Sequence, residues 1–380
     1  MIRQLRMTSF KCFELLKLPL APLTVLSGFN ASGKSSVLQA LTLLHQTMVD
    51  HEWSTRLILN GTDLSLGTVG DVLDNLSAHK SFGLGLTWDT HCLDWTFYAE
   101  DRRDLSAVVT QVQMDTNTYD SPHNLRFLVP PDAYTSMEAP LDAIRTLTYL
   151  TAERIGPLDV YSLQDHHRPG GVGSRGEHTV SVLFVGRDQH VSGPLRIPGE
   201  ISTRYHQTIG HMRSFFPGFS LTLDRIPSTN LITMGIRLSE ATEFHRPRHV
   251  GFGITQVLPI VTAGLSTDPG GIIVVENPEV HLHPAGQAMM GRFLAQVAAA
   301  GIQVIVETHS DHVLSGIRRA VKSAMIDADS VALHFFRPRS DTSESVLSPI
   351  LDRDGIIDMW PDGFFDQFDK DASYFAGWGN

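Results

Sequence analysis

Apolar and polar positions at the start of the chain predict a strand, a loop and a helix. Residues 2–10 and 23–27 have the apolar patterning of two strands. From Val37 to about Met48 the apolar residues recur three and four positions apart, as they do on one face of a helix. The nine residues 28–36 lie between the second strand and this helix and are expected to form a loop.

Further along the chain the pattern changes twice. Residues 57–127 carry alternating apolar and aromatic positions, which predict a mostly antiparallel β segment. Residues 250–336 return to strands separated by helices, and this order favours a largely parallel sheet that the first strands share. The other expected elements are strands at 146–156, 219–223, 231–238, 272–275, 302–306 and 331–336, and helices at 202–215 and after Gly253, Pro284 and Ser310.

The loop at residues 28–36 has the spacing GxxxxGK[ST] of a phosphate-binding loop. Glycines let backbone N–H groups approach phosphate oxygens, and the helix that follows adds its positive dipole end. In such a loop Lys34 reaches the β and γ phosphates, and the Ser35 hydroxyl binds Mg²⁺. The sequence therefore predicts ATP and Mg²⁺ as cofactors, with the nucleotide-binding residues Gly28, Asn30, Ser32, Gly33, Lys34, Ser35 and Ser36.

The strand at 272–275 ends in a carboxylate-rich turn. A phosphate-binding loop needs carboxylates opposite the γ phosphate to hold Mg²⁺ and the attacking water. Glu276 is expected to hold Mg²⁺ through its water shell, and Glu279 or Asn277 to orient the water. A core strand that ends in a solvated turn explains the same residues equally well in isolation, but the loop upstream favours the catalytic interpretation.

The next strand, at 302–306, ends close to His309. A histidine at this position can donate a hydrogen bond to the γ phosphate, so His309 joins the expected catalytic residues. The same segment also predicts a helix start with Ser310 or Asp311 as its N-cap, and the two interpretations are compatible.

Composition and charge limit the classes of protein to which the chain can belong. The chain has 380 residues, 42% of them hydrophobic and 19% charged, as in a globular protein with a sizeable core. Its net charge of −11 opposes nonspecific binding of nucleic acid by the whole surface. Cys12 and Cys92 lie far apart in sequence without CxxC spacing, so they suggest neither a disulfide framework nor a thiolate metal site. We expect a cytoplasmic protein with no membrane partner, because the chain shows neither a signal peptide nor an apolar run long enough to span a bilayer.

Two further patterns favour ordinary structure over function. Residues 171–176 match GxGxxG, but with no clear strand before and no helix after they predict a flexible loop. His281, His283, His309 and His312 outline a metal site only loosely, and we expect no catalytic transition metal there.

Taken together, these segments resemble the ABC-type ATPases of the RecF, SMC and OLD class. A poorly characterised bacterial branch of this class, labelled AAA family ATPase, is often encoded in defence loci. The chain resembles this branch in Glu276 to Glu279 (sequence ENPE), in residues 149–157 and in its aromatic tail. The segments that carry the resemblance are Ser9 to Phe13, Gly28 to Ser36, Glu276 to Pro284 and Glu307 to Asp311.

The resemblance implies an α/β fold: a P-loop NTPase of ABC-ATPase type with a mostly parallel central sheet, an antiparallel β subdomain and a helical insertion. The tail is expected to form a hairpin with Asp354 and Gly355 in its turn, followed by an aromatic segment that docks on the ATPase or on a partner. The expected parts are an N-terminal ATPase lobe (1–56), its antiparallel β part (57–140), a helical and loop insertion (141–249), a C-terminal ATPase lobe (250–336), and the hairpin and aromatic tail (337–380).

The resemblance also assigns a signature motif to residues 250–256. Such a motif touches the γ phosphate bound by the opposite protomer, which implies roles for Gly253, Thr255 and Gln256 and a homodimer or higher even oligomer. Most relatives carry a catalytic glutamate where this chain has Asn277. Because an amide cannot accept a proton as a carboxylate does, either Glu279 is the base or hydrolysis is slow.

Three functions are compatible with these features. The favoured one is an ATP-dependent switch that controls a separately encoded effector, with antiphage defence as its setting. The second is a RecF-like repair ATPase that clamps DNA, and the acidic net charge argues against it. The basic residues Arg246, Arg248 and His249 could contact phosphates of nucleotide or DNA, and a solvated loop explains them about equally well. The third is a transporter subunit that drives a membrane partner. It ranks last, because no segment of the chain resembles the region that couples such subunits to their membrane partners.

Overall fold

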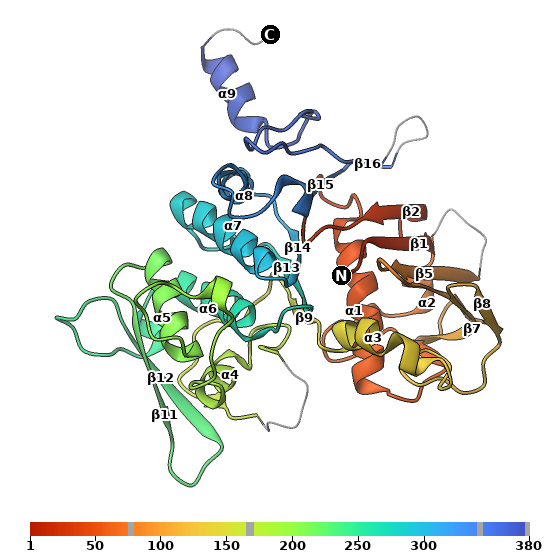
Figure 1. Cartoon of the computed structure of the whole chain (residues 1–380), viewed down its shortest axis with the longest axis horizontal. Helices are drawn as coiled ribbons and strands as arrows, with labels where there is room; N and C mark the ends of the chain where they lie inside the picture. The colour runs from red at the N-terminus through yellow and green to blue at the C-terminus, as the bar shows by residue number, and fades with distance from the viewer. Residues whose placement is uncertain (75–79, 165–170, 340–344, 377–380) are drawn as a thin grey trace. The chain divides into compact units, whose positions relative to one another are not determined.

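The computed structural model describes residues 1–74, 80–164, 171–339 and 345–376, and the chain divides into two compact units (Figure 1). Each unit is assembled from separate stretches of sequence. Unit 1 contains residues 1–21, 28–147 and 334–348, and unit 2 contains residues 22–27, 148–333 and 349–380.

Unit 1 is built on an antiparallel sheet. Apolar side chains alternate along its strands, so that Leu5 pairs with Leu86 and Met7 with Leu84, and all four are buried. The strand order is β2-β1-β5-β6-β7-β4, with β8 beside β7. Its elements are β1 (Gln4–Phe10), β2 (Phe13–Pro19), α1 (Lys34–Asp50), β4 (Arg56–Ile58), α2 (Val69–Val72), β5 (Ser81–Thr87), β6 (Cys92–Tyr98), β7 (Ser106–Met114), β8 (Asn117–Asp120), η1 (Tyr134–Met137), α3 (Glu138–Arg145) and β16 (Val346–Leu347).

Unit 2 is built on parallel strands in the order β3-β14-β13-β9, which confirms the predicted α/β alternation. The strands read as continuous apolar runs because both faces are buried. They are β3 (Leu23–Gly28), β9 (Thr148–Leu150), β13 (Ile272–Glu276) and β14 (Gln303–Glu307), and the helices α6 (Phe252–Ser266), α7 (Pro284–Ala299) and α8 (Asp311–Lys322) alternate with them.

A smaller antiparallel sheet in unit 2 has the order β10-β12-β11. β15 starts in unit 2 and ends in unit 1, where it pairs with β16. The remaining elements are β10 (Tyr161–Ser162), α4 (Thr179–Val185), η2 (Gly193–Leu195), α5 (Arg204–Phe215), β11 (Ser220–Arg225), β12 (Leu231–Arg237), η3 (Pro247–His249), η4 (Ala328–Ser330), β15 (Val331–Phe336) and α9 (Gln367–Phe375).

Two local predictions were wrong. The strand expected at 146–156 stops at Leu150, because the chain then turns to hydrogen-bond the end of β13. The GxGxxG segment does precede a helix, α4, which begins three residues after Gly176. The segment itself contains turns and bends, in agreement with the predicted loop, and residues 165–170 before it lie outside the described residues.

The tail contains the expected turn. Gly355 has φ +74, its N–H donates to the Asp352 carbonyl, and a single antiparallel bridge joins Leu351 to Ile357. Arg318 of α8 donates to the Gly355 carbonyl and lies 5.5 Å from the Trp360 ring centroid. This part of the tail therefore docks on α8.

No described helix is both long and apolar enough to cross a bilayer.

Candidate functional site

The phosphate-binding loop of unit 1 depends on two glycines. Gly28 has φ +131, and a Cβ there would lie 2.1 Å from the carbonyl oxygen of Phe336. Gly33 has φ +100, and a Cβ there would lie 2.5 Å from Sγ of Cys12. Both positions favour glycine for conformation and for space, so the path of the loop depends on them.

Lys34 closes the loop on itself. Its Nζ donates to the carbonyls of Phe29 at 2.7 Å and Gly28 at 3.2 Å, and its side chain is only 4% exposed. Ser32 Oγ donates to the same Phe29 carbonyl at 2.7 Å. The N-cap of α1 is Gly33, which supplies no side-chain cap, so the positive end of the helix faces the loop.

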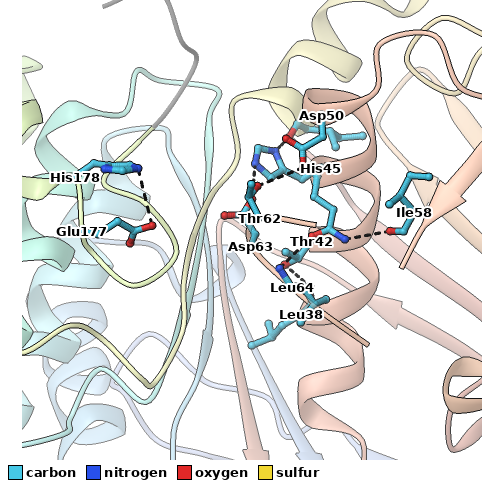
Figure 2. Close-up of polar contacts among 12 residues, drawn as sticks. Leu38, Thr42, His45, Asp50, Ile58, Thr62, Asp63, Leu64, Glu177 and His178 are labelled. Atoms are coloured by element: carbon cyan, nitrogen blue, oxygen red, sulfur yellow. Dashed lines mark hydrogen bonds and ion pairs between the residues drawn. The ribbon is translucent and has the colours of Figure 1, made fainter. Parts of the chain in front are cut away.

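A polar cluster anchors α1 further along its length (Figure 2). Nδ1 of His45 lies 2.7 Å from the Ile144 carbonyl at the end of α3, and Nε2 lies 3.5 Å from a carboxylate oxygen of Asp63. Burial lowers the pKa of His45. Gln46 donates to the Ile58 carbonyl and accepts from the Leu64 N–H. These contacts fix the helix that carries the loop.

In unit 2 the acidic end of β13 lies in register with its neighbours. Glu276 pairs with Glu307 of β14, and Glu307 pairs with Leu26 of β3. The carboxyl ends of the three strands therefore lie at one sheet edge, the edge where ligands bind in open parallel sheets. The chain runs from β3 directly into the phosphate-binding loop.

The Glu276 carboxylate is held by β9 and by the turn that follows it. One oxygen accepts from the Tyr149 hydroxyl at 2.8 Å. The other accepts from the Thr151 hydroxyl at 3.3 Å and from the Ala152 N–H at 3.2 Å. Burial and the neighbouring carboxylate raise the pKa of Tyr149, so its hydroxyl remains a donor at neutral pH.

The backbone that follows Glu276 is held by Arg154. Its guanidinium donates to the carbonyls of Glu276 at 2.9 Å, Asn277 at 2.8 Å and Thr151 at 3.0 Å. Asn277 has φ +40, and its buried side-chain oxygen has no hydrogen-bond partner among the described residues. The turn is therefore held in a left-handed conformation that few non-glycine residues adopt.

Glu279 faces the end of β14. Its carboxylate accepts from the Thr308 hydroxyl at 2.8 Å and from the His309 N–H at 2.9 Å. His309 is exposed, and Ser310 is the N-cap of α8, accepting from the Val313 N–H at 3.1 Å. The structure thus brings Glu276, Asn277, Glu279 and His309 together at one sheet edge, and it confirms the predicted cap.

The predicted signature residues lie at the start of α6. Thr255 and Gln256 are buried, and the Thr255 hydroxyl donates to the Phe252 carbonyl at 2.9 Å. The Gln256 amide donates to the Ile155 carbonyl at 3.3 Å. A Cβ on Gly253 would lie 2.8 Å from the His281 carbonyl oxygen, so this glycine allows close packing.

Ser35 of unit 1 and Glu276 of unit 2 each carry side-chain oxygens, and Mg²⁺ prefers oxygen ligands. Among the described residues, no group of three or more His, Cys, Asp or Glu side chains could hold a metal ion by itself.

Sequence reasoning gave no role to Tyr149, Thr151, Arg154 or Thr308. Their contacts to β13 and the turn after it join positions far apart in the chain, 127 residues apart for Tyr149 and Glu276. The local signal was a pair of charged residues, Glu153 and Arg154, at the end of a mostly uncharged segment.

Comparison with protein families and solved structures supports an ATPase fold. Residues 1–117 match a family described as "AAA ATPase domain", and residues 166–315 match "AAA domain, putative AbiEii toxin, Type IV TA system". Residues 326–373 match "Protein of unknown function (DUF3696)". No curated protein matches the chain.

Two solved structures are similar over almost the whole chain. An Smc head bound to the C-winged helix domain of ScpA gives a TM-score of 0.56 at 13% identity, covering 92% of this chain and 98% of that one. An Smc head with an extended coiled coil, bound to the C-terminal domain of ScpA and derived from Pyrococcus furiosus, gives 0.50 at 12% identity, covering 91% and 96%. The chain therefore has an α/β fold that resembles the Smc head P-loop ATPase, and the two ATPase-domain matches support ATP binding and hydrolysis.

Proposed function

We propose that this protein binds ATP and hydrolyses it slowly as a homodimeric switch. The observation that carries the proposal is the loop between β3 and α1. Its two glycines have positive φ, Lys34 folds onto loop carbonyls, and α1 begins there without a side-chain cap. Phosphate oxygens would replace those carbonyls as acceptors for Lys34 and would meet the positive end of the helix.

The edge of the parallel sheet supplies the groups for hydrolysis. We assign the general base to Glu279, because Asn277 stands where a carboxylate is usual and cannot accept the proton. Each Glu279 oxygen accepts one hydrogen bond and has a second lone pair for the attacking water. His309 would donate to the γ phosphate. Ser35 and Glu276 would hold Mg²⁺, which neutralises charge on the phosphates when it is bound.

Dimerisation would complete the site. Gly251 and Phe252, at the start of α6, are exposed, whereas the side chains of Thr255 and Gln256 are buried. We therefore propose that the exposed start of α6 at Gly251 and Phe252, with the half-buried Gly253 beside it, approaches the γ phosphate bound by a second protomer. Assembly and release of the dimer would then signal to a separately encoded effector, with antiphage defence as the setting.

A DNA clamp is the second candidate, and similarity to Smc heads is the observation that favours it. Its proposed contact residues are only partly available, because Arg248 already forms an ion pair with Asp159 at 3.3 Å. A clamp should bind duplex DNA with ATP and lose affinity steeply as salt rises.

The test is phosphate release under saturating Mg·ATP, with and without duplex DNA, together with the mass of the protein in solution. Slow turnover that ignores DNA, with ATP-dependent dimers, supports the switch. Fast turnover stimulated by DNA supports the clamp.

Lys34→Ala tests the site assignment and should lower ATP affinity or turnover at least tenfold. The matched control is Lys17→Ala, at an exposed position on β2. Equal rates for Lys34→Ala and wild type would refute the site assignment.

A further inference from the structure

The turn after β9 contacts the acidic end of β13 through both its side chains and its backbone. Three donors, on Tyr149 of β9 and on Thr151 and Ala152 of the turn, contact the two oxygens of Glu276. A carboxylate that accepts three hydrogen bonds is held in one orientation. The Glu276 side chain is therefore positioned by β9 and the turn after it and not by solvent.

Glutamate has the length that this contact needs. β9 is the neighbour of β13, with Leu150 paired to Val275, so the donors lie on the adjacent strand and just beyond its end. Adjacent strands are about 4.8 Å apart, and a side chain must cross much of that gap to meet a donor on its neighbour. An aspartate at position 276 would be one methylene shorter and would reach these donors less well.

Arg154 holds the peptide that follows. It is 5% exposed and donates to three carbonyls, two of which belong to Glu276 and Asn277. Burial lowers its pKa to about 10, so the guanidinium stays charged at neutral pH. A buried arginine that satisfies backbone carbonyls fixes a turn more firmly than water would, because its planar donors are pre-organised.

This turn determines where the catalytic carboxylate stands. Glu279 follows Asn277 by two residues, so a shift of the peptide held by Arg154 would move Glu279 relative to Thr308 and His309. We propose that Tyr149 and Arg154 are positioning residues for hydrolysis: they orient Glu276 and Glu279 without touching the nucleotide. The inference rests on the proposed ATPase function.

Tyr149→Phe is the cleanest variant, because it removes one hydroxyl and keeps the ring. The matched control is Tyr161→Phe. Tyr149 and Tyr161 are each 6% exposed, but the Tyr161 hydroxyl accepts from the Leu158 N–H instead of donating to a carboxylate. We expect Tyr149→Phe to lower kcat about tenfold, because one of the hydrogen bonds that orient the Glu276 carboxylate is lost. KM and the affinity for a fluorescent ATP analogue should stay within about twofold of wild type, because the phosphate-binding loop is unchanged.

Arg154→Lys tests the second residue. Lysine keeps the charge but not the planar set of donors, so kcat should fall about tenfold or more while nucleotide affinity is retained. If Arg154→Lys fails to fold, as judged by its circular dichroism and thermal melting, the kcat of Tyr149→Phe alone tests the positioning role.

The outcomes separate the two proposals. A wild-type protein that does not hydrolyse ATP would refute the proposed function, and this inference with it. A wild-type protein that hydrolyses ATP, with Tyr149→Phe at the same kcat, would refute the positioning role only. A fall in kcat shared by Tyr149→Phe and Tyr161→Phe would refute it as well, since the loss would then follow from any buried hydroxyl.

Discussion

His334 should make the protein lose stability as the pH falls. The residue lies in the part of β15 that belongs to unit 1 and is 2% exposed. Its Nε2 lies 2.8 Å from the Pro19 carbonyl and its Nδ1 lies 2.8 Å from the Ser348 hydroxyl. A neutral ring satisfies both partners, with Nε2 donating and Nδ1 accepting. Burial lowers the pKa of His334 from 6.5 to about 4.

The sign of the effect follows from the two pKa values. In the unfolded chain His334 takes up a proton near pH 6.5, whereas in the folded protein it does so only near pH 4. The contribution of neutral His334 to the free energy of unfolding is therefore fully present above pH 6.5 and is lost as the pH falls toward 4. The full difference corresponds to about 3 kcal/mol, of which about 2 kcal/mol is lost between pH 7.5 and 5.0.

Denaturant unfolding followed by tryptophan fluorescence measures this loss, since the buried Trp88 and Trp95 report on unit 1. His334→Gln keeps a donor and an acceptor but does not titrate. The stability difference between wild type and His334→Gln should shrink by about 2 kcal/mol from pH 7.5 to pH 5.0. His190→Gln, an exposed position, is the control. Parallel pH profiles for wild type and His334→Gln would refute the reasoning.

Two further substitutions test the site itself. Gly33→Ala should lower nucleotide affinity at least tenfold in calorimetry, because its Cβ would lie 2.5 Å from Cys12 Sγ at a φ of +100. The control is Gly193→Ala, whose Cβ would have no neighbouring atom within 4 Å. An unaltered affinity for Gly33→Ala would contradict the loop geometry. Glu279→Gln should abolish phosphate release and accumulate ATP-bound dimers, because an amide cannot act as the base. If Glu276→Gln abolishes turnover while Glu279→Gln leaves it intact, the base is not Glu279.

Much of the fold could be predicted because its signals are local. The loop before α1, the apolar runs of β13 and β14 and the Ser310 cap each depend on a few neighbouring residues. The observed bounds of β13 and β14 differ from the expected ones by one position, and α1 begins three residues before Val37. The turn after β9 could not be predicted in this way. Arg154 and Tyr149 act on residues more than 120 positions away, and nothing nearby in the sequence shows that contact.

The strand with which β1 pairs could not be predicted from neighbouring residues either. Its alternating pattern predicted a strand, but not that Leu5 and Met7 would lie opposite β5, some 80 residues later. Hydrophobic periodicity defines which face of a strand is buried, whereas the partner depends on the whole topology.

The interleaved order of the two units has a consequence for folding during synthesis. β3 is made among the first 28 residues, but its partner β14 begins only at Gln303. Unit 1 likewise lacks residues 334–348 until most of the chain has left the ribosome. Neither unit can be completed early, and such non-local pairing makes folding slow and leaves apolar strands uncovered meanwhile. We therefore expect the nascent chain to need chaperones, and no single uninterrupted fragment to yield either unit alone.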